Sequence, residues 1–363
     1  MPLSFSKKSI NSVRARVAKD PLIRMQEKYK VYYQTFDRQE GSRVWQGGKE
    51  YVMLSSNDYL GLGDHPKVIE AGKKALEKWG SSTTGARLAN GSRRYHIELE
   101  ERIAKFLGTE ACHVSVAGYV SCMSGIASFA QRGDAIFVNK NVHSSLMSGV
   151  GLTDARVERF RHNDPADLEE ALKYEKAETT KFLVFEGVYS MEGHVAPAEA
   201  LLKVGDRHDC FTIMDDAHGF GVLGRGGRGT LNHFDLTGKV DLVCGSFSKA
   251  LSSTGGFIAG DQELIDFLRT HSKQTIFSAA LSPSQAACAQ AALEVLQSEP
   301  EHLENLWKNT HRFNEILARR DLDTWESRTP AIPIVLGSKE KVYFFWKALM
   351  EKGVFTVMSV APG

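Results

Sequence analysis

The sequence predicts an α/β protein with a mostly parallel β-sheet flanked by helices. Short apolar runs, typical of buried strands, recur at four places: 135–139, 181–186, 211–215 and 241–246. Stretches of helical length, such as 165–177 and 197–208, separate these runs. Strands that alternate with helices form βαβ units, whose strands lie parallel in one sheet. With 363 residues, 42% of them hydrophobic, the chain is long enough to bury a substantial core.

The segments before these runs predict an N-terminal helical arm over 1–50 and a strand over 51–54. A helix is expected from Pro66 to Trp79, because proline is tolerated in a first helical turn and Gly80 follows the last apolar residue. A second helix is expected from Tyr95 to Leu107.

The character of the chain changes after Pro283. We expect helices over 284–298 and 300–319, a strand over 331–335, a helix over 338–351 and a strand over 354–358. We therefore predict a large domain over 51–282 and a smaller α+β domain over 283–363.

Composition excludes several classes of protein. The formal net charge of +1 gives no electrostatic footprint for nucleic acid or for an anionic membrane surface. No apolar run approaches the roughly 18 residues of a membrane-spanning helix. The five cysteines are widely spaced, with no C-x-x-C pair, so a disulfide scaffold or a zinc ribbon is not expected. Reduced, buried thiols fit a cytoplasmic protein.

Ionisable side chains follow three of the apolar runs, at Glu186, at Asp215 to His218 and at Lys249. Ligands bind at the carboxyl ends of the strands in open α/β sheets, so we expect these residues to form one site. Most lysines are solvated surface charges. Lys249 is instead flanked by small and hydroxyl-bearing residues, and 242–260 contain no other charge. A lysine in such a setting can have a lowered pKa and form a Schiff base.

Asp215 and Asp216 end an apolar run, so one of their carboxylates is expected to be buried, where it needs a cationic partner. Two alternatives stay open: a helix N-cap, which Asp commonly provides, and a metal pair. No further carboxylate or histidine spacing supports a metal, and we predict none. His218 is close enough in sequence to face the same ligand as Asp215.

Two further segments are candidates for ligand contacts. His143 follows the run 135–139, although a histidine alone is more often packed or capping than functional. Gly118 and Tyr119 open a helix expected over 118–130, and amides at a helix start can bind an anion. A simple tight turn explains these two residues equally well.

Two motifs point to other functions, and both are weak. Residues 224–229 match G-x-G-x-x-G, but they do not join a strand to a helix, so we interpret them as a flexible turn. Residues 246–249 match the S-x-x-K of serine acyl enzymes. That interpretation requires S-D-N and K-T-G companions, and the chain contains neither string.

Taken together, the segments resemble the α-oxoamine synthases. These are pyridoxal 5′-phosphate (PLP) enzymes of fold type I, a group that includes 8-amino-7-oxononanoate synthase, 2-amino-3-ketobutyrate CoA ligase, 5-aminolevulinate synthase and serine palmitoyltransferase. The resemblance lies in seven strings in order: SSNDYLGL (55–62), SSTTGARLANGS (81–92), VHSS (142–145), EGVYSMEGH (186–194), DDAHGFGVLGRGGRG (215–229), SFSKALSSTGG (246–256) and IFSAALSP (276–283).

The resemblance implies catalytic roles at matching positions. Lys249 would hold PLP through its amine and move protons at the amino-acid Cα. Asp215 would pair with the pyridine nitrogen and His218 with the phenolic oxygen, while His143 would stack on the ring. The cofactor would then be the cation that a buried Asp215 requires, and the protonated ring would act as an electron sink.

The resemblance also implies contacts around the ring. Ser190 would touch the ring substituents, and Ser246 with the amides of Gly118 and Tyr119 would hold the phosphate. Asn57 matches a substrate-contacting asparagine. The site of this group lies at a homodimer interface, so Ser278 would reach the phosphate of the neighbouring subunit.

The implied reaction is the decarboxylative condensation of a small amino acid with an acyl thioester, on CoA or on a carrier protein. The alternatives are an aminotransferase or PLP lyase on the same fold, and a non-catalytic homologue. The loop 81–92 looks more like that of synthases making longer-chain or secondary-metabolite amino ketones than like that of the biotin-pathway enzyme.

Two features depart from the group. Its members continue past the position of Gly363 and usually supply there an arginine that grips the substrate carboxylate, so we expect this chain to be truncated. Ala279 stands where many relatives have a hydroxyl residue, which leaves the contact to the neighbouring phosphate to Ser278.

Overall fold

The computed structural model describes residues 8–360, so the first seven residues of the predicted arm and the last three of the chain lie outside it. The chain divides into two compact units. The larger unit comprises Ser56–Val335, and the smaller one combines the residues up to Ser55 with those from Leu336 onward. The predicted domain limits near residues 50 and 283 stay a prediction.

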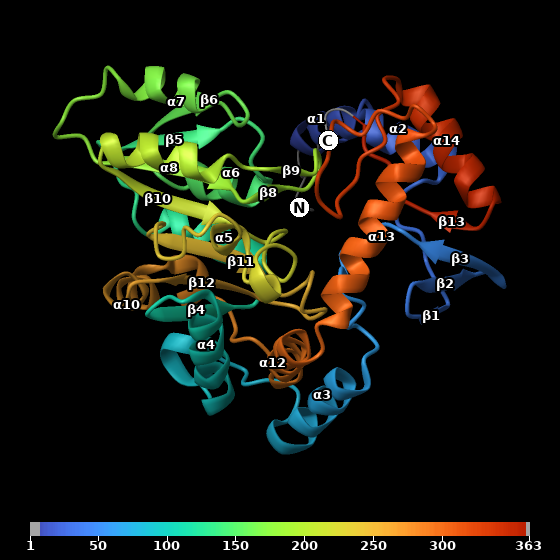
Figure 1. Ribbon diagram of the computed structural model, residues 1–363, viewed down its shortest axis with the longest axis horizontal. Helices are drawn as coiled ribbons and strands as arrows, with labels where there is room; N and C mark the ends of the chain where they lie inside the picture. The colour runs from blue at the N-terminus through green and yellow to red at the C-terminus, as the bar shows by residue number, and fades with distance from the viewer. Residues whose placement is uncertain (1–7, 361–363) are drawn as a thin grey trace, which may run out of the picture. The chain divides into compact units, whose positions relative to one another are not determined.

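A mixed sheet of seven strands forms the centre of the larger unit (Figure 1). Its order is β4 (Ala111–Ser115), β12 (Gly256–Gly260), β11 (Leu242–Ser246), β10 (Cys210–Asp215), β7 (Lys181–Glu186), β5 (Ala135–Asn139) and β6 (Arg156–Phe160). Only β12 runs antiparallel to its two neighbours within this sheet. The predicted mostly parallel sheet is therefore confirmed, and the runs at 135–139 and 181–186 coincide with β5 and β7.

Helices cover both faces of the sheet, because successive side chains of a strand point to opposite sides. In β7, Phe182 and Val184 belong to the core that also contains residues of α5 and α6. Leu183 and Phe185 belong to the core shared with α4 and α12. The helices of this unit are α3 (Pro66–Trp79), α4 (Arg94–Leu107), α5 (Gly118–Ala127), α6 (Ser144–Gly151), α7 (Pro165–Leu172), α8 (Ala198–Arg207), α9 (Thr230–His233), α10 (Gln262–His271), α11 (Lys273–Ile276), α12 (Pro283–Ser298) and α13 (Glu301–Ala318).

The smaller unit has its own sheet and core. It comprises α1 (Lys8–Val17), α2 (Pro21–Tyr29), β1 (Arg38–Glu40), β2 (Arg43–Gln46), β3 (Lys49–Met53), α14 (Lys339–Glu351) and β13 (Val354–Phe355). Strands β1 to β3 are antiparallel, and β13 pairs with β3 in parallel. One core cluster of this unit contains the buried residues Val31, Trp346, Met358 and Val360.

Several local predictions differ from the structure. The strand predicted at 331–335 is wrong: this segment is irregular, because Pro330 and Pro333 lack the N–H that a strand ladder needs. The helix predicted over 165–177 ends earlier, at Leu172. The sequence does not predict strands β4, β6 and β12, or the short hairpin of β8 (Val188–Tyr189) and β9 (His194–Val195).

Candidate active site

The strand ends named in the sequence analysis meet at one edge of the sheet. The backbone N–H of His143, after β5, donates to the carboxylate of Glu186 at the end of β7. The N–H of Gly187 donates to the carbonyl of Asp215 over 2.8 Å, at the end of β10. The N–H of Asp216 donates to the carbonyl of Cys244 in β11, also over 2.8 Å. Hydrogen bonds donated by backbone N–H groups thus connect the ends of these neighbouring strands.

Asp215 and Asp216 have different hydrogen-bond partners, which the residue pattern alone does not distinguish. Asp216 accepts hydrogen bonds from the N–H and the hydroxyl of Thr230, at 2.8 and 2.6 Å, so it fixes the start of α9. Burial raises the pKa of Asp216 to about 7, although the bonds from Thr230 oppose this. Asp216 is therefore occupied within the fold.

The carboxylate of Asp215 is also buried, but it has only two weaker protein partners. Its Oδ1 accepts the N–H of Ala217 over 3.0 Å, and its Oδ2 lies 3.1 Å from the thiol sulfur of Cys122. Within residues 8–360, Asp215 has no cation at ion-pair distance. A buried carboxylate without such a partner is costly, so this site suits a ligand that carries positive charge.

His218 follows the same strand, and its Nδ1 lies 2.7 Å from the hydroxyl oxygen of Tyr59. The pKa of His218 is lowered to about 3, mainly by burial and in smaller part by the positive charges of Lys249 and His143. The ring is therefore neutral at physiological pH.

Lys249 lies three residues beyond the end of β11 and is half-buried. Its carbonyl accepts the N–H of Ser252 over 2.9 Å, and Ser252 adopts a left-handed backbone conformation with φ of 48°. Its ammonium group forms no ion pair inside the described part of the chain. The charge of Lys249 nevertheless lowers the pKa of both His143 and His218.

His143 caps the start of α6, since its Nδ1 accepts the N–H of Ser145 over 3.2 Å. Its ring is exposed and meets the ring of Tyr119 edge to face, with centroids 6.0 Å apart. Desolvation lowers the pKa of His143, and Asp215 opposes that effect. Burial raises the pKa of Glu186 well above its usual range, and the nearby Asp215 adds to the shift. The carboxyl group of Glu186 thus joins the end of β7 to the loop of His143.

An anion-binding cradle lies where α5 begins. Ala117, the residue before α5, provides no side-chain cap, so the first amides, from Gly118 and Tyr119, are free for a ligand. Gly118 packs against Ser246: a Cβ at this position would lie 2.5 Å from Cβ of Ser246 and 2.7 Å from its hydroxyl oxygen. The Ser246 hydroxyl lies 2.7 Å from that of Ser248. Glycine is thus what lets the helix start approach the end of β11.

Three predicted contact residues are not linked by hydrogen bonds to this group. Ser190 is half-buried just after β8, and Asn57 is exposed in the loop that carries Tyr59. Ser278 follows α11, where its hydroxyl donates to the carbonyl of Gln274 over 2.5 Å. Phe277 beside it is 85% exposed. The roles of these three residues stay predictions.

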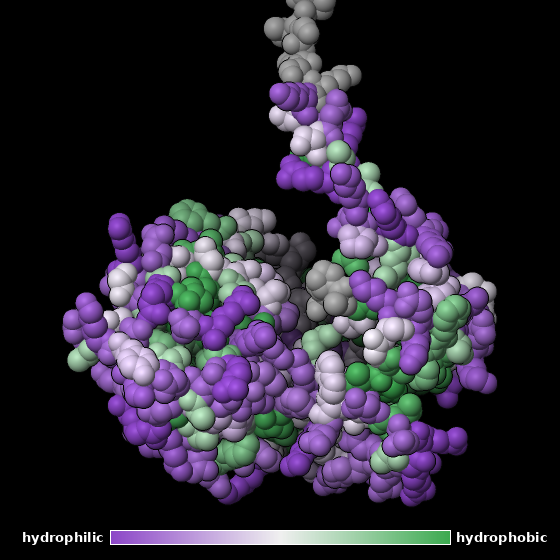
Figure 2. Space-filling model, turned by 90° about the horizontal axis from the view of Figure 1, so that it is seen from above, coloured by the Kyte–Doolittle hydropathy of each residue, from purple (hydrophilic) through white to green (hydrophobic). Residues whose placement is uncertain are grey.

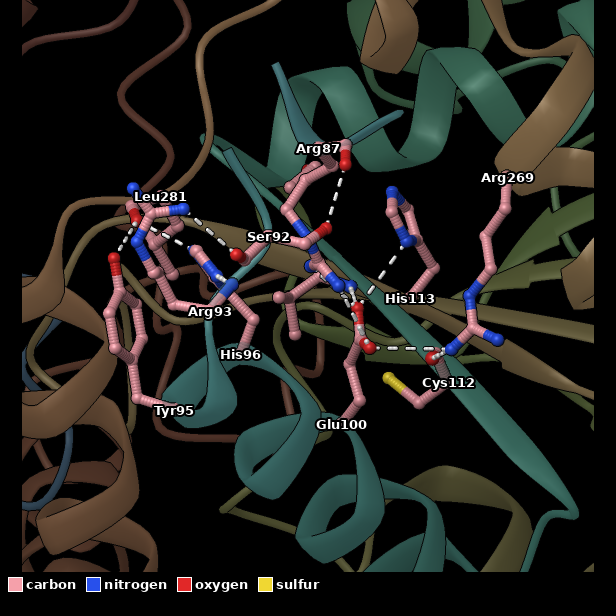
Figure 3. A network of polar contacts seen from close by, with 12 residues as sticks. Arg87, Ser92, Arg93, Tyr95, His96, Glu100, Cys112, His113, Arg269 and Leu281 are labelled. Carbon is pink, nitrogen blue, oxygen red and sulfur yellow. Dashed lines mark hydrogen bonds and ion pairs between the residues drawn. The ribbon is translucent and has the colours of Figure 1, made fainter. Parts of the chain in front are cut away.

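A buried ionic network holds the loop 81–92, as Figure 3 shows. Glu100 of α4 is 3% exposed and forms a bidentate pair with Arg87 of this loop, at 2.8 and 3.2 Å. It also contacts Arg269 at 3.3 Å and His113 at 3.3 Å. Burial opposes ionisation, but the bonds from His113 and Arg87 lower the pKa of Glu100 to about 2.

The same loop holds the segment that carries Ser278. The N–H of Ala280 donates to the carbonyl of Gly85 over 2.9 Å. The carbonyl of Leu281 lies 2.8 Å from the ring Nε2 of His96, at the start of α4 (Figure 3). The segments 81–92 and 276–283, both singled out by the resemblance, therefore form one supported surface.

Sequence reasoning missed several supporting residues. Two of them, Tyr59 and Cys122, contact partners more than ninety positions away in the chain. The third, Glu100, contacts Arg87 in a loop whose conformation the sequence does not reveal. Tyr59 lies inside one of the seven matching strings, which is its only signal in the sequence. Cys122 and Glu100 carry none.

One group of three potential metal ligands lies in the described chain, namely His65, Glu299 and His302. His65 Nδ1 already accepts the N–H of Lys67 over 3.3 Å, and the Lys67 ammonium pairs with Glu299. His302 Nδ1 lies 3.1 Å from the carbonyl oxygen of Leu60. We therefore interpret the group as an ion-pair cluster with partners of its own.

No helix in residues 8–360 combines the length and the apolar character needed to cross a bilayer. Figure 2 shows hydrophilic residues over most of the face that it presents, with smaller hydrophobic patches between them.

Comparison with known proteins assigns the family. The model of the family described as aminotransferase class I and II matches residues 49–362. The chain belongs to this family. Within the aminotransferase class I and II family, the chain is 38% identical to the serine palmitoyltransferase of Sphingobacterium spiritivorum over 332 residues, which are 92% of this chain and 83% of that protein. It is also 38% identical to 8-amino-7-oxononanoate synthase 1 of Bacillus velezensis, over 90% of this chain and 83% of that protein.

Solved structures agree with this assignment. The serine palmitoyltransferase of Sphingomonas wittichii has a TM-score of 0.91 and 30% identity, over 99% of this chain and 90% of that one. A serine palmitoyltransferase from S. paucimobilis with bound PLP–myriocin aldimine has a TM-score of 0.90 and 30% identity, over 94% and 91% of the two chains. The fold-type I architecture and the resemblance to the α-oxoamine synthases are both confirmed.

Proposed function

We propose that this chain is a PLP-dependent C-acyltransferase of the α-oxoamine synthase group. It condenses a small amino acid with an acyl thioester, releases carbon dioxide and thiol, and yields an α-amino ketone. The relatives named above support this activity. The observation that carries it is the buried carboxylate of Asp215, which has no ion-pair partner within residues 8–360 and lies at the same edge of the sheet as the loops of Lys249, His218 and His143.

The residues present fit PLP. The uncapped start of α5 and Ser246 suit a phosphate group, and the glycine at 118 leaves room that a Cβ would fill. Asp215 suits a protonated pyridine nitrogen, and Lys249 supplies the amine that an aldehyde needs. When bound, PLP supplies an electron sink that stabilises negative charge at the amino-acid Cα.

The protein's own groups then have distinct tasks. We assign to Lys249 the removal and return of the proton at Cα, since its positive charge acts on both His143 and His218 and its ammonium group forms no ion pair within residues 8–360. Asp215 would keep the pyridine nitrogen protonated, because a nearby carboxylate favours the charged form of a base. His218, whose pKa is lowered by burial, would provide a hydrogen bond to the phenolic oxygen, and His143 would cover one face of the ring. Ser190 and Asn57 are assigned to ring substituents and substrate.

We further propose a cytoplasmic homodimer with shared sites, in which Ser278 reaches the phosphate of the partner subunit. Phe277 next to Ser278 is 85% exposed, so this segment presents a large aromatic side chain that such an interface would cover. The five free cysteines suit a reducing compartment.

Turnover with a thioester tests the activity. Amino acids such as glycine, alanine and serine are incubated with acyl-CoAs of rising chain length, and with acyl carrier protein, in the presence of PLP. We expect carbon dioxide and free thiol to appear in equal amounts. Amino transfer to a keto acid without thiol release would favour the aminotransferase alternative, and a colourless, inactive protein at saturating PLP would favour the non-catalytic one.

A further inference from the structure

The hydrogen bond between Tyr59 and His218 lies at the site and has no role in the function proposed above. The hydroxyl oxygen of Tyr59 lies 2.7 Å from Nδ1 of His218, and the two rings meet edge to face with centroids 6.0 Å apart. This distance is ideal for an O–H hydrogen bond. It joins the loop before α3 to the loop after β10.

Tyr59 is held rigidly. Its ring packs against a small buried cluster made of Val188, Val222 and Leu223. The N–H of Tyr59 donates to the carbonyl of Asn57 over 2.8 Å, which closes a tight turn just before the tyrosine. Burial of the hydroxyl raises the pKa of Tyr59, so the phenol keeps its proton.

The residue before Tyr59 anchors the same loop to the turn of the lysine. The Asp58 carboxylate accepts the N–H of Leu62 and that of Gly63, each over 3.0 Å, and also the hydroxyl of Ser252. Ser252 in turn donates its N–H to the carbonyl of Lys249 over 2.9 Å. The loop thus connects His218 and Lys249 through two independent contacts.

The direction of the Tyr59–His218 bond follows from the chemistry of the two groups. A neutral imidazole has one N–H and one acceptor nitrogen. The phenol is the stronger acid and the imidazole nitrogen the better acceptor, so the phenol O–H donates to Nδ1. The proton of the ring then sits on Nε2, which makes no hydrogen bond within residues 8–360.

We propose that Tyr59 is a positioning residue that fixes His218 in the tautomer with its proton on Nε2, so that this nitrogen can donate a hydrogen bond to an anionic oxygen of the bound cofactor. The inference rests on the proposed function for the identity of that oxygen. Without Tyr59, the two tautomers of His218 would compete, and only one of them presents the proton on Nε2.

The test is Tyr59→Phe, which removes one oxygen and keeps the ring. In protein labelled with ¹⁵N-histidine and free of PLP, NMR reports which ring nitrogen of His218 is protonated, with His218→Gln assigning the signal. We expect the Nε2–H tautomer in the wild type and a mixture in Tyr59→Phe. We also expect PLP to bind about five- to tenfold more weakly, as the loss of one hydrogen bond implies.

Tyr174→Phe is the matched control, because Tyr174 follows α7 in the larger unit and its side chain is 75% exposed. It should leave both measurements unchanged. In a His218→Gln background, Tyr59→Phe should weaken PLP binding no further, since its effect acts through His218. Wild-type protein with the proton on Nδ1 would overturn the proposal, and so would a Tyr59→Phe protein that binds PLP weakly with an unchanged tautomer.

These measurements separate this inference from the activity. If PLP binds and the tautomer shifts as expected but no thioester is consumed, the proposed reaction fails while the role of Tyr59 stands. If thiol and carbon dioxide are released normally and Tyr59→Phe changes neither the tautomer nor PLP affinity, only the inference fails.

Discussion

Replacing Gly118 by alanine should damage the cofactor site although alanine is the better helix former. In the first turn of a helix, this substitution normally gains roughly 0.5–1 kcal/mol. Here the new Cβ would lie 2.5 Å from Cβ of Ser246 and 2.7 Å from its hydroxyl oxygen, closer than carbon atoms can approach. Overpacking of this kind costs about 1–3 kcal/mol. The start of α5 must therefore move away from Ser246.

The consequence is measured as PLP affinity and as free energy of unfolding in urea. We expect Gly118→Ala to bind PLP at least tenfold more weakly and to be destabilised by about 1–2 kcal/mol. Gly151→Ala is the control, since Gly151 ends α6 and nothing lies within 4 Å of the position that its new methyl group would take. It should be neutral or slightly stabilising. Wild-type PLP affinity in Gly118→Ala would refute the assignment of the cradle.

Three further predictions concern buried charges and the thiol at the site. Glu100→Gln should lower the free energy of unfolding by about 3–5 kcal/mol, because it leaves Arg87 without its anionic partner. Glu98→Gln, on the exposed side of the same helix, is the control and should change the free energy of unfolding by less than about 0.5 kcal/mol. The pKa of Glu100 is lowered to about 2 in the folded chain, so its ionised carboxylate stabilises the fold fully above the unfolded pKa near 4.5, and this stabilisation is lost as the pH falls from there toward 2. Urea unfolding at pH 7, 4 and 3 should show this loss of stability in the wild type. An equal loss in Glu100→Gln would contradict the prediction. Cys122→Ala removes the weak donor to Asp215 and should weaken PLP binding about threefold, while Cys288→Ala, which does not contact Asp215, should have no effect.

The sequence predicts the central strands well because their physical signal is strong. Strands β5 and β7 are buried on both faces, so they appear as continuous apolar runs with clear limits. β6 is mostly exposed and charged, and β12 contains two glycines, so neither has that signal. At 331–335 an apolar run misleads, because prolines remove the donors that a ladder requires.

The site likewise contains residues that the sequence predicts and residues that it does not. The positions of Asp215 and Lys249 follow from strand ends and from the absence of neighbouring charge. Pattern alone leaves Asp215 and Asp216 equivalent, and only the family resemblance selects Asp215. The difference between them depends on Thr230, fourteen positions along the chain, which occupies the carboxylate of Asp216. The contact of Tyr59 with His218 could not be predicted either, since the two residues are 159 positions apart. Such contacts depend on tertiary structure, which pattern and spacing do not encode.

Covalent attachment of PLP at Lys249 is the central claim, and mass spectrometry tests it most directly. The PLP-loaded protein is reduced with borohydride, digested and mapped. We predict the cofactor mass on the peptide that contains Lys249, together with a visible absorption band in the wild type that Lys249→Ala lacks. A cofactor mass on another lysine, or none at saturating PLP, would contradict the account.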